Sequence, residues 1–137
     1  MKKIILFGLA VLVAFAVTES CKKKKDGGSG DRCGESEIKV ATIPANGTVD
    51  PPAPGTTFPL VVNVESMPAS GASIAISAKA EGNSTAYYTD TLAVAKASNS
   101  FQITNTPAGV TCVVSVTVTS KTCNTNQWKG SYRYSAK

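Results

Sequence analysis

The chain contains no histidine among its 137 residues. Histidine is the commonest general base near neutral pH and the commonest metal ligand. The acidic residues beyond residue 30 are scattered; Glu35 and Glu37 come closest together, at a ragged strand start where we expect them to be solvated. Glycine-rich phosphate loops, zinc spacings and calcium loops are also missing. We therefore expect a protein that is not an enzyme and that has no cofactor and no metal site.

A clustered excess of positive charge is lacking too, although the formal net charge is +5. From Asp31 onward, eight Lys or Arg stand against seven Asp or Glu, a difference of +1. The remaining basic residues lie within the first 25. Proteins that bind nucleic acid carry clustered Lys and Arg on the folded domain itself. We therefore expect no nucleic-acid partner.

Amphipathic helical periodicity is absent beyond residue 32, where apolar residues recur at every second position. The clearest case is the run from Val110 to Thr119, in which every even-numbered residue is Val or Cys. Such alternation is typical of a half-buried antiparallel strand. Similar runs separated by Gly, Pro and Asn turns are Glu37–Ile43, Leu60–Ser66, Ala72–Glu81, Ser84–Val94, Ser100–Asn105 and Gln127–Ser135.

About seven strands in roughly 105 residues predict a β-sandwich, with a small closed barrel as the alternative. The stretch FQITNTPAGVTCVVSVTVTSKT, residues 101 to 122, resembles the E–F–G region of fibronectin type III and related immunoglobulin-like domains. In those domains a Pro/Gly turn leads into a long alternating strand, although here Cys112 replaces the usual tyrosine. The resemblance implies an all-β, immunoglobulin-like antiparallel β-sandwich over residues 33–137.

The N-terminus begins with Met1-Lys2-Lys3, followed by residues 4 to 17, which are all apolar or Gly. A basic start, an apolar run of about 7–15 residues and small residues before a cleavage point describe a secretory signal peptide. The same run is short for a bilayer span, which takes about 20 apolar residues. An uncleaved N-terminal anchor is the alternative.

Cys21 stands between this apolar run and four lysines, in the sequence TESCKKKKDGG. The junction resembles the lipobox of bacterial lipoproteins, in the relaxed form followed by lysines that is found in Bacteroidota. Ser20 fits the position before the cut, whereas Thr18 and Glu19 depart from the usual pattern. The resemblance implies that residues 1–20 are a lipoprotein signal peptide, that Cys21 is lipidated, and that the protein is an exported envelope protein.

Residues 21–32 form the predicted tether between this lipid and the domain. Lys22–Lys25 would contact anionic headgroups, act as a solvated spacer, or do both, and the Gly-rich residues after them predict flexibility. Because Lys22 is not an aspartate, the resemblance implies the outer membrane. Whether the domain faces the periplasm or the cell surface stays open.

Two stretches suggest ligand binding or modification. In WKGSYRY, residues 128 to 134, the aromatic residues alternate with Lys129 and Arg133, which could bind an acidic glycan. The alternative is that the aromatics form the core face of the last strand. On the strand predicted over Ser84–Val94, alternation places Tyr87 outward as a candidate ligand-binding aromatic. Thr91 lies in a short DTL sequence that resembles the O-glycosylation acceptor of Bacteroidota.

Three cysteines remain once Cys21 is lipidated, and export favours a disulfide between two of them. Cys112 lies on the apolar face of its strand, so we expect a buried free thiol. Cys123 follows eleven residues later, too far along an extended strand to reach Cys112 unless the strand ends early. In an immunoglobulin-like sandwich, the start of the first strand and the turn before the last strand lie at the same pole. We therefore predict a Cys33–Cys123 disulfide.

Together these features predict a membrane-anchored envelope lipoprotein whose domain is a non-catalytic interaction module for a glycan or a protein. The alternative is a structural or accessory component of an envelope assembly, with no ligand of its own.

Overall fold

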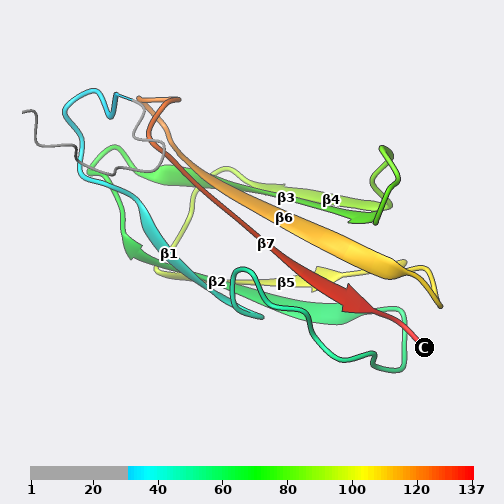
Figure 1. Cartoon of the computed structure of the whole chain (residues 1–137). Coiled ribbons are helices and arrows are strands. Elements are labelled where there is room, and N and C mark those ends of the chain that lie inside the picture. The colour runs from blue at the N-terminus through cyan, green and yellow to red at the C-terminus, as the bar shows by residue number, and fades with distance from the viewer. Residues whose placement is uncertain (1–30) are drawn as a thin grey trace, which may run out of the picture.

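The computed structural model describes residues 31–137 (Figure 1). The predicted signal peptide, Cys21 and most of the predicted tether lie outside the described residues. Seven β-strands follow one another along the described chain. Their bounds are β1 (Lys39–Ile43), β2 (Phe58–Ser66), β3 (Ala72–Ala80), β4 (Tyr88–Leu92), β5 (Ser98–Ile103), β6 (Thr111–Ser120) and β7 (Gln127–Ser135).

The strands form two separate antiparallel sheets that face each other as two layers (Figure 1). One sheet has the order β1-β2-β5, and the other has the order β4-β3-β6-β7. The prediction of an immunoglobulin-like β-sandwich is therefore confirmed. The alternative of a closed barrel is wrong, because no strand pairing among residues 31–137 joins the two sheets into one.

The core lies between the two sheets and follows the two-residue period of the sequence. In β6 the residues Cys112, Val114, Val116 and Val118 are all buried, as the alternation predicted. Leu60, Val62 and Val64 of β2 face them from the other sheet. Val110 does not belong to this face, because β6 begins only at Thr111 and Val110 is exposed.

The strand predicted over Ser84–Val94 is shorter than expected, because β4 spans only Tyr88–Leu92. It pairs with β3 alone and is therefore an edge strand. The residues before it form a turn in which the Thr85 backbone N–H donates to Asn83 Oδ1 over 2.9 Å. Val94, which alternation placed inside, is 58% exposed, since the pairing with β3 has ended before it.

The strand predicted over Ser100–Asn105 begins two residues earlier than expected, because β5 spans Ser98–Ile103. The amide of Asn99 explains this early start. Its Nδ2 donates to the carbonyls of Val62 and Lys96, and its Oδ1 accepts from the Lys96 backbone N–H over 2.9 Å. The buried amide thus closes the preceding turn and ties β5 to β2, so the chain pairs sooner than its composition suggests.

The long loop between β1 and β2, residues 44–57, lies along the free edge of β7. The backbone N–H groups of Gly47, Asp50 and Ala53 donate to carbonyls of β7 over 2.7–3.1 Å. The contact runs parallel to β7, with bridges at Val49–Arg133 and Ala53–Ala136. Unpaired strand edges invite pairing with other chains, and this loop covers one of them.

Candidate functional site

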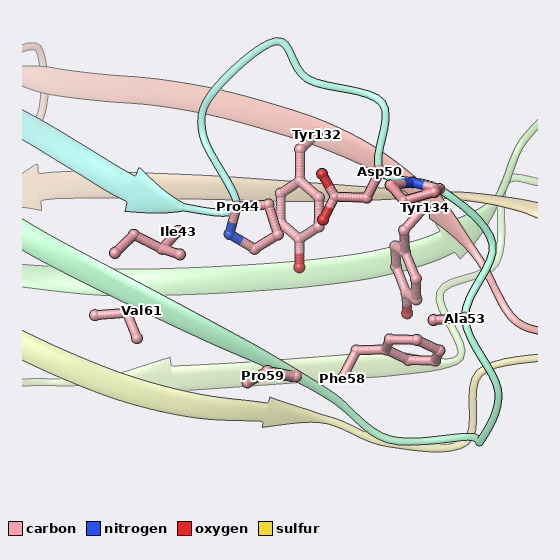
Figure 2. Close-up of a pocket in the computed structure, with 10 residues that line it drawn as sticks. Ile43, Pro44, Asp50, Ala53, Phe58, Pro59, Val61, Tyr132 and Tyr134 are labelled. Carbon is pink, nitrogen blue, oxygen red and sulfur yellow. The ribbon is translucent and has the colours of Figure 1, made fainter.

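A concave apolar site lies between the β1–β2 loop, the beginning of β2 and the end of β7. We call it the β7 groove; its volume is about 370 Å³, which falls within the usual range for small-molecule sites, about 300–1,000 Å³. Its lining residues are Ile43, Pro44, Asp50, Pro51, Ala53, Phe58, Pro59, Val61, Tyr132 and Tyr134 (Figure 2).

The alternation of β7 directs two tyrosines toward this groove. Tyr132 and Tyr134 are 3% exposed, so the interpretation of WKGSYRY as a core face is confirmed for both. Trp128 is half-buried and packs against the same core. Its indole lies over Gly130, where an added Cβ would come within 2.2 Å of the indole Cη2. Glycine therefore leaves the space that the tryptophan ring occupies.

The hydroxyl of Tyr134 is fully engaged at the side of the groove. It forms hydrogen bonds of 2.7 Å with Thr106 Oγ1 and with the hydroxyl of Tyr87. The Tyr134 ring also packs against Phe58, with 4.6 Å between the ring centroids. Burial raises the pKa of both Tyr87 and Tyr134, so both hydroxyls stay protonated at neutral pH.

The hydroxyl of Tyr132 differs from that of Tyr134. In the part of the chain that the structure describes, it is the buried side-chain polar atom that lacks a hydrogen-bond partner. Figure 2 shows it pointing into the space surrounded by Pro44, Phe58 and Pro59. Burial raises the pKa of Tyr132, with smaller contributions from Tyr134 and from the negative charge of Asp50. The groove therefore contains a neutral hydroxyl that is able to donate.

Asp50 is the acidic residue of the groove. Its backbone N–H donates to the Arg133 carbonyl over 2.8 Å, which fixes the residue beside β7. Its carboxylate accepts a long hydrogen bond of 3.4 Å from Thr48 Oγ1. Across residues 31–137 the ion pairs are Arg32–Glu37 and Arg133–Glu81, so neither involves Asp50. The groove thus combines apolar walls with one unpartnered hydroxyl and one carboxylate that forms no ion pair.

The three residues predicted to bind a ligand do not come together. Lys129 is exposed on the outer face of β7. Arg133 shares that face, but its Nε is 2.9 Å from Glu81 Oε1 in an ion pair. Tyr87 points to the opposite side, so the prediction that it faces outward is wrong. It precedes β4, where the period of the strand does not apply, and its hydroxyl reaches Tyr134 in the core.

Thr91, the predicted O-glycosylation site, lies on the edge strand β4 and is exposed. Its backbone N–H donates to Asp90 Oδ1 over 2.7 Å. The structure therefore places the residue where it is accessible, and its modification stays a prediction.

The predicted disulfide is present between Cys33 and Cys123, with 6.0 Å between the two Cα atoms. Cys112 is a free and buried cysteine, as expected. The disulfide ties the segment before β1 to the turn between β6 and β7, at one pole of the sandwich. At the same pole, Thr125 Oγ1 donates to the backbone carbonyl of Asp31, the first described residue.

Glu35 is a residue that the sequence interpretation missed. Its carboxylate accepts hydrogen bonds from Ser70 over 2.9 Å, from Asn126 over 3.1 Å, and from Thr122. Hydrogen bonds from Ser120, Thr122 and Asn126 lower its pKa to about 2. The expectation that it is simply solvated is wrong, because side chains from two separate turns converge on it. Glu35 therefore joins the N-terminal segment to the β2–β3 and β6–β7 turns.

We expect Glu35→Gln to lower the melting temperature by a few degrees at pH 7. The folded pKa of Glu35, about 2, lies below the value of about 4.3 in an unfolded chain. Its carboxylate therefore stabilises the fold fully above the unfolded pKa, and this contribution is lost as the pH falls toward 2. Thermal melts of both proteins between pH 7 and pH 2 should converge. Glu37→Gln is the control, and a gap independent of pH would contradict this role.

Across residues 31–137, no cluster of three or more Cys, Asp or Glu side chains could hold a metal ion. The same residues include no helix that is long and apolar enough to cross a membrane. Comparison of the chain with protein-family models, curated proteins and solved structures gives no match.

Proposed function

We propose that this protein is an exported envelope lipoprotein, anchored through a lipid on Cys21, whose domain is a non-catalytic binding module for an envelope glycan or protein. The observation that carries the proposal is the junction TESCKKKK, in which a cysteine follows a signal-like apolar run after three intervening residues and directly precedes four lysines. A lipoprotein cysteine that carries more than one acyl chain gives persistent attachment, which a single chain does not. The lysines that follow Cys21 would add attraction to anionic headgroups.

The layout of the domain supports an anchor at this end. The described chain begins at Asp31, beside the Cys33–Cys123 disulfide, whereas Lys137 lies at the opposite end of the sandwich (Figure 1). The β7 groove lies along the half of β7 that approaches Lys137. A tether joined at Asp31 would therefore leave this half of the domain free to meet a partner. By the pattern of lipoprotein sorting, Lys22 favours the outer membrane.

A direct test examines the N-terminus of the protein purified from membranes of the expressing cells. We expect mass spectrometry to find a chain that begins at an acylated Cys21. Cys21→Ala should remove the acyl groups and leave residues 1–20 attached, because the lipid must be added before the cut. Ser20→Ala keeps a small residue before the cut and serves as the matched control. An unmodified Cys21 in the unaltered protein would refute the anchor.

A structural or accessory role in an envelope assembly is the second candidate. The placement of the three predicted binding residues favours it, because Tyr87 lies on the opposite side of the sheet from Lys129 and Arg133. A glycan array separates the two roles. Specific binding of one glycan class, lost in Lys129→Ala and retained in Lys121→Ala, would support the binding module. Equal binding by both variants would count against the outer face of β7 as the site.

A further inference from the structure

The β7 groove contains a polar atom that the protein itself leaves unsatisfied. Tyr132 is 3% exposed, and its hydroxyl has no hydrogen-bond partner among the described residues. An unmade hydrogen bond is costly for a buried hydroxyl, and native proteins rarely retain one without a reason. Tyr132 lines the groove and its hydroxyl points toward it (Figure 2), although the oxygen has almost no accessible surface; a bound molecule that displaces a neighbouring wall residue slightly could supply the missing partner.

A second polar group of the groove carries a negative charge. The Asp50 carboxylate is half-buried and forms no ion pair among residues 31–137. It lies close enough to Tyr132 for its charge to contribute to the raised pKa of that hydroxyl. A carboxylate beside low-dielectric apolar walls attracts a cation more strongly than one surrounded by water does. The charge of the groove therefore favours a positively charged ligand.

The size and the walls of the groove favour a small molecule over a protein surface. Its volume of about 370 Å³ suits a compact ligand, whereas a stable protein interface buries about 800 Å² on each partner. Phe58 and three prolines supply rigid apolar walls. Such walls match a ring or a short hydrocarbon, which gains free energy when its surface leaves water.

We infer that the β7 groove binds a small organic cation with an apolar, ring-containing body. The ammonium group pairs with the Asp50 carboxylate, and a hydroxyl on the ligand exchanges a hydrogen bond with Tyr132. The ring lies against Phe58 and the prolines. This site is separate from the outer face of β7, and it goes beyond the proposed anchoring role because it does not require a membrane.

NMR titration of the full-length protein in detergent, with ¹³C-labelled tyrosine, tests whether the β7 groove binds such a cation. The chain has four tyrosines, so each signal can be assigned separately. Phenethylamine, 2-phenylethanol and 3-phenylpropionate share a similar apolar body and differ in charge. We expect phenethylamine to shift the Tyr132 and Tyr134 signals, to leave Tyr88 unshifted, and to bind about fivefold tighter than 2-phenylethanol. Equal affinity for all three compounds, or no shift at Tyr132, would overturn the inference.

The contribution of Asp50 is isolated by a pair of matched variants. Asp50→Asn should weaken phenethylamine binding about fivefold and leave 2-phenylethanol unaffected, since only the ion pair is lost. Asp90→Asn removes the same charge from β4, at the other edge of the sheet, and should change neither affinity. If both variants weaken binding equally, the effect is one of overall charge and the assignment to Asp50 fails.

Tyr132→Phe tests the hydroxyl without altering the shape of the groove. The variant should melt at the same or a higher temperature, because it removes an unsatisfied buried group. Tyramine carries the additional hydroxyl that phenethylamine lacks, so it should bind more tightly to the unaltered protein, and this advantage should vanish in Tyr132→Phe. An advantage that persists would overturn the proposed role of Tyr132. If the amines do not bind although Cys21 is acylated, the inference about the groove fails and the proposed anchor stands. If the amines bind although Cys21 is not acylated, the anchor fails and the inference about the groove stands.

Discussion

Replacing both Cys33 and Cys123 with alanine is expected to lower the free energy of unfolding by about 4–5 kcal/mol, on the chain-entropy view of disulfides. The two residues are 90 positions apart in the sequence, so their disulfide constrains almost the entire described chain in its unfolded state. Domains of this size are stable by about 5–15 kcal/mol in total. The loss should therefore remove a large share of the stability of the domain. Alanine suits position 123, because Cys123 is 2% exposed and a serine there would bury a hydroxyl.

Urea unfolding with and without reductant measures this contribution. The unaltered protein in reductant should unfold at the same urea concentration as the double variant, and reductant should have no further effect on the double variant. Cys112→Ala is the control for the third thiol, because Cys112 is buried but unbridged. In this variant, reductant should lower the free energy of unfolding as much as it does in the unaltered protein. If reductant lowers the free energy of unfolding of the unaltered protein by less than about 1 kcal/mol, the disulfide contributes little, as happens when the reduced chain keeps residual structure.

The strands and the core could be predicted from the sequence because their signals are local. Alternation over ten residues indicates which side of β6 is buried, and turns that contain Gly, Pro or Asn separate most of the strands. The disulfide pairing followed from the same topology, since strand geometry excludes Cys112 and the pole of the sandwich brings Cys33 to Cys123. Errors arose where the pattern ends, as at Val110 and Val94, which alternation placed inside but which are exposed.

The contacts of the candidate site could not be predicted because its parts are far apart in the sequence. Glu35 meets Ser70, Thr122 and Asn126, which are 35, 87 and 91 residues away. The sequence does not indicate which carboxylate a hydroxyl or amide in a turn will contact. The β7 groove likewise combines the β1–β2 loop with residues of β1, β2 and β7. The sequence places several prolines and glycines in that loop, but nothing in it indicated that the loop would lie along β7.

The position of Tyr87 shows how one contact changes the interpretation of a residue. Taken as part of a strand, it belonged to the outer face and was a candidate for binding a glycan. In the structure its hydroxyl bonds to Tyr134, which also bonds to Thr106 and packs on Phe58. Tyr134 therefore links three segments from other parts of the chain to β7, namely the turn before β4, the β5–β6 connection and the beginning of β2.

Tyr134→Ala is accordingly expected to destabilise the domain by about 3–5 kcal/mol, the usual cost of removing a buried aromatic ring. Tyr134→Phe keeps the ring and should cost about 1–3 kcal/mol, because it leaves the buried Thr106 hydroxyl without its partner. Urea unfolding at pH 7 measures both values. Tyr88→Phe is the matched control, since its hydroxyl meets only Asp90 at the exposed edge strand. It should change the free energy of unfolding by about 0.5 kcal/mol or less.

A double-mutant cycle tests whether Tyr87 and Tyr134 act as one unit. If their 2.7 Å hydrogen bond contributes to stability, the losses from Tyr87→Phe and Tyr134→Phe should not add. The second substitution then removes a partner that the first has already lost, so the double variant should be more stable than the sum of the single losses predicts. We expect a coupling of about 0.5–1.5 kcal/mol, the net contribution of an ordinary hydrogen bond. Additive losses would mean that each hydroxyl is satisfied independently, and that Tyr87 contributes to the core through its ring alone.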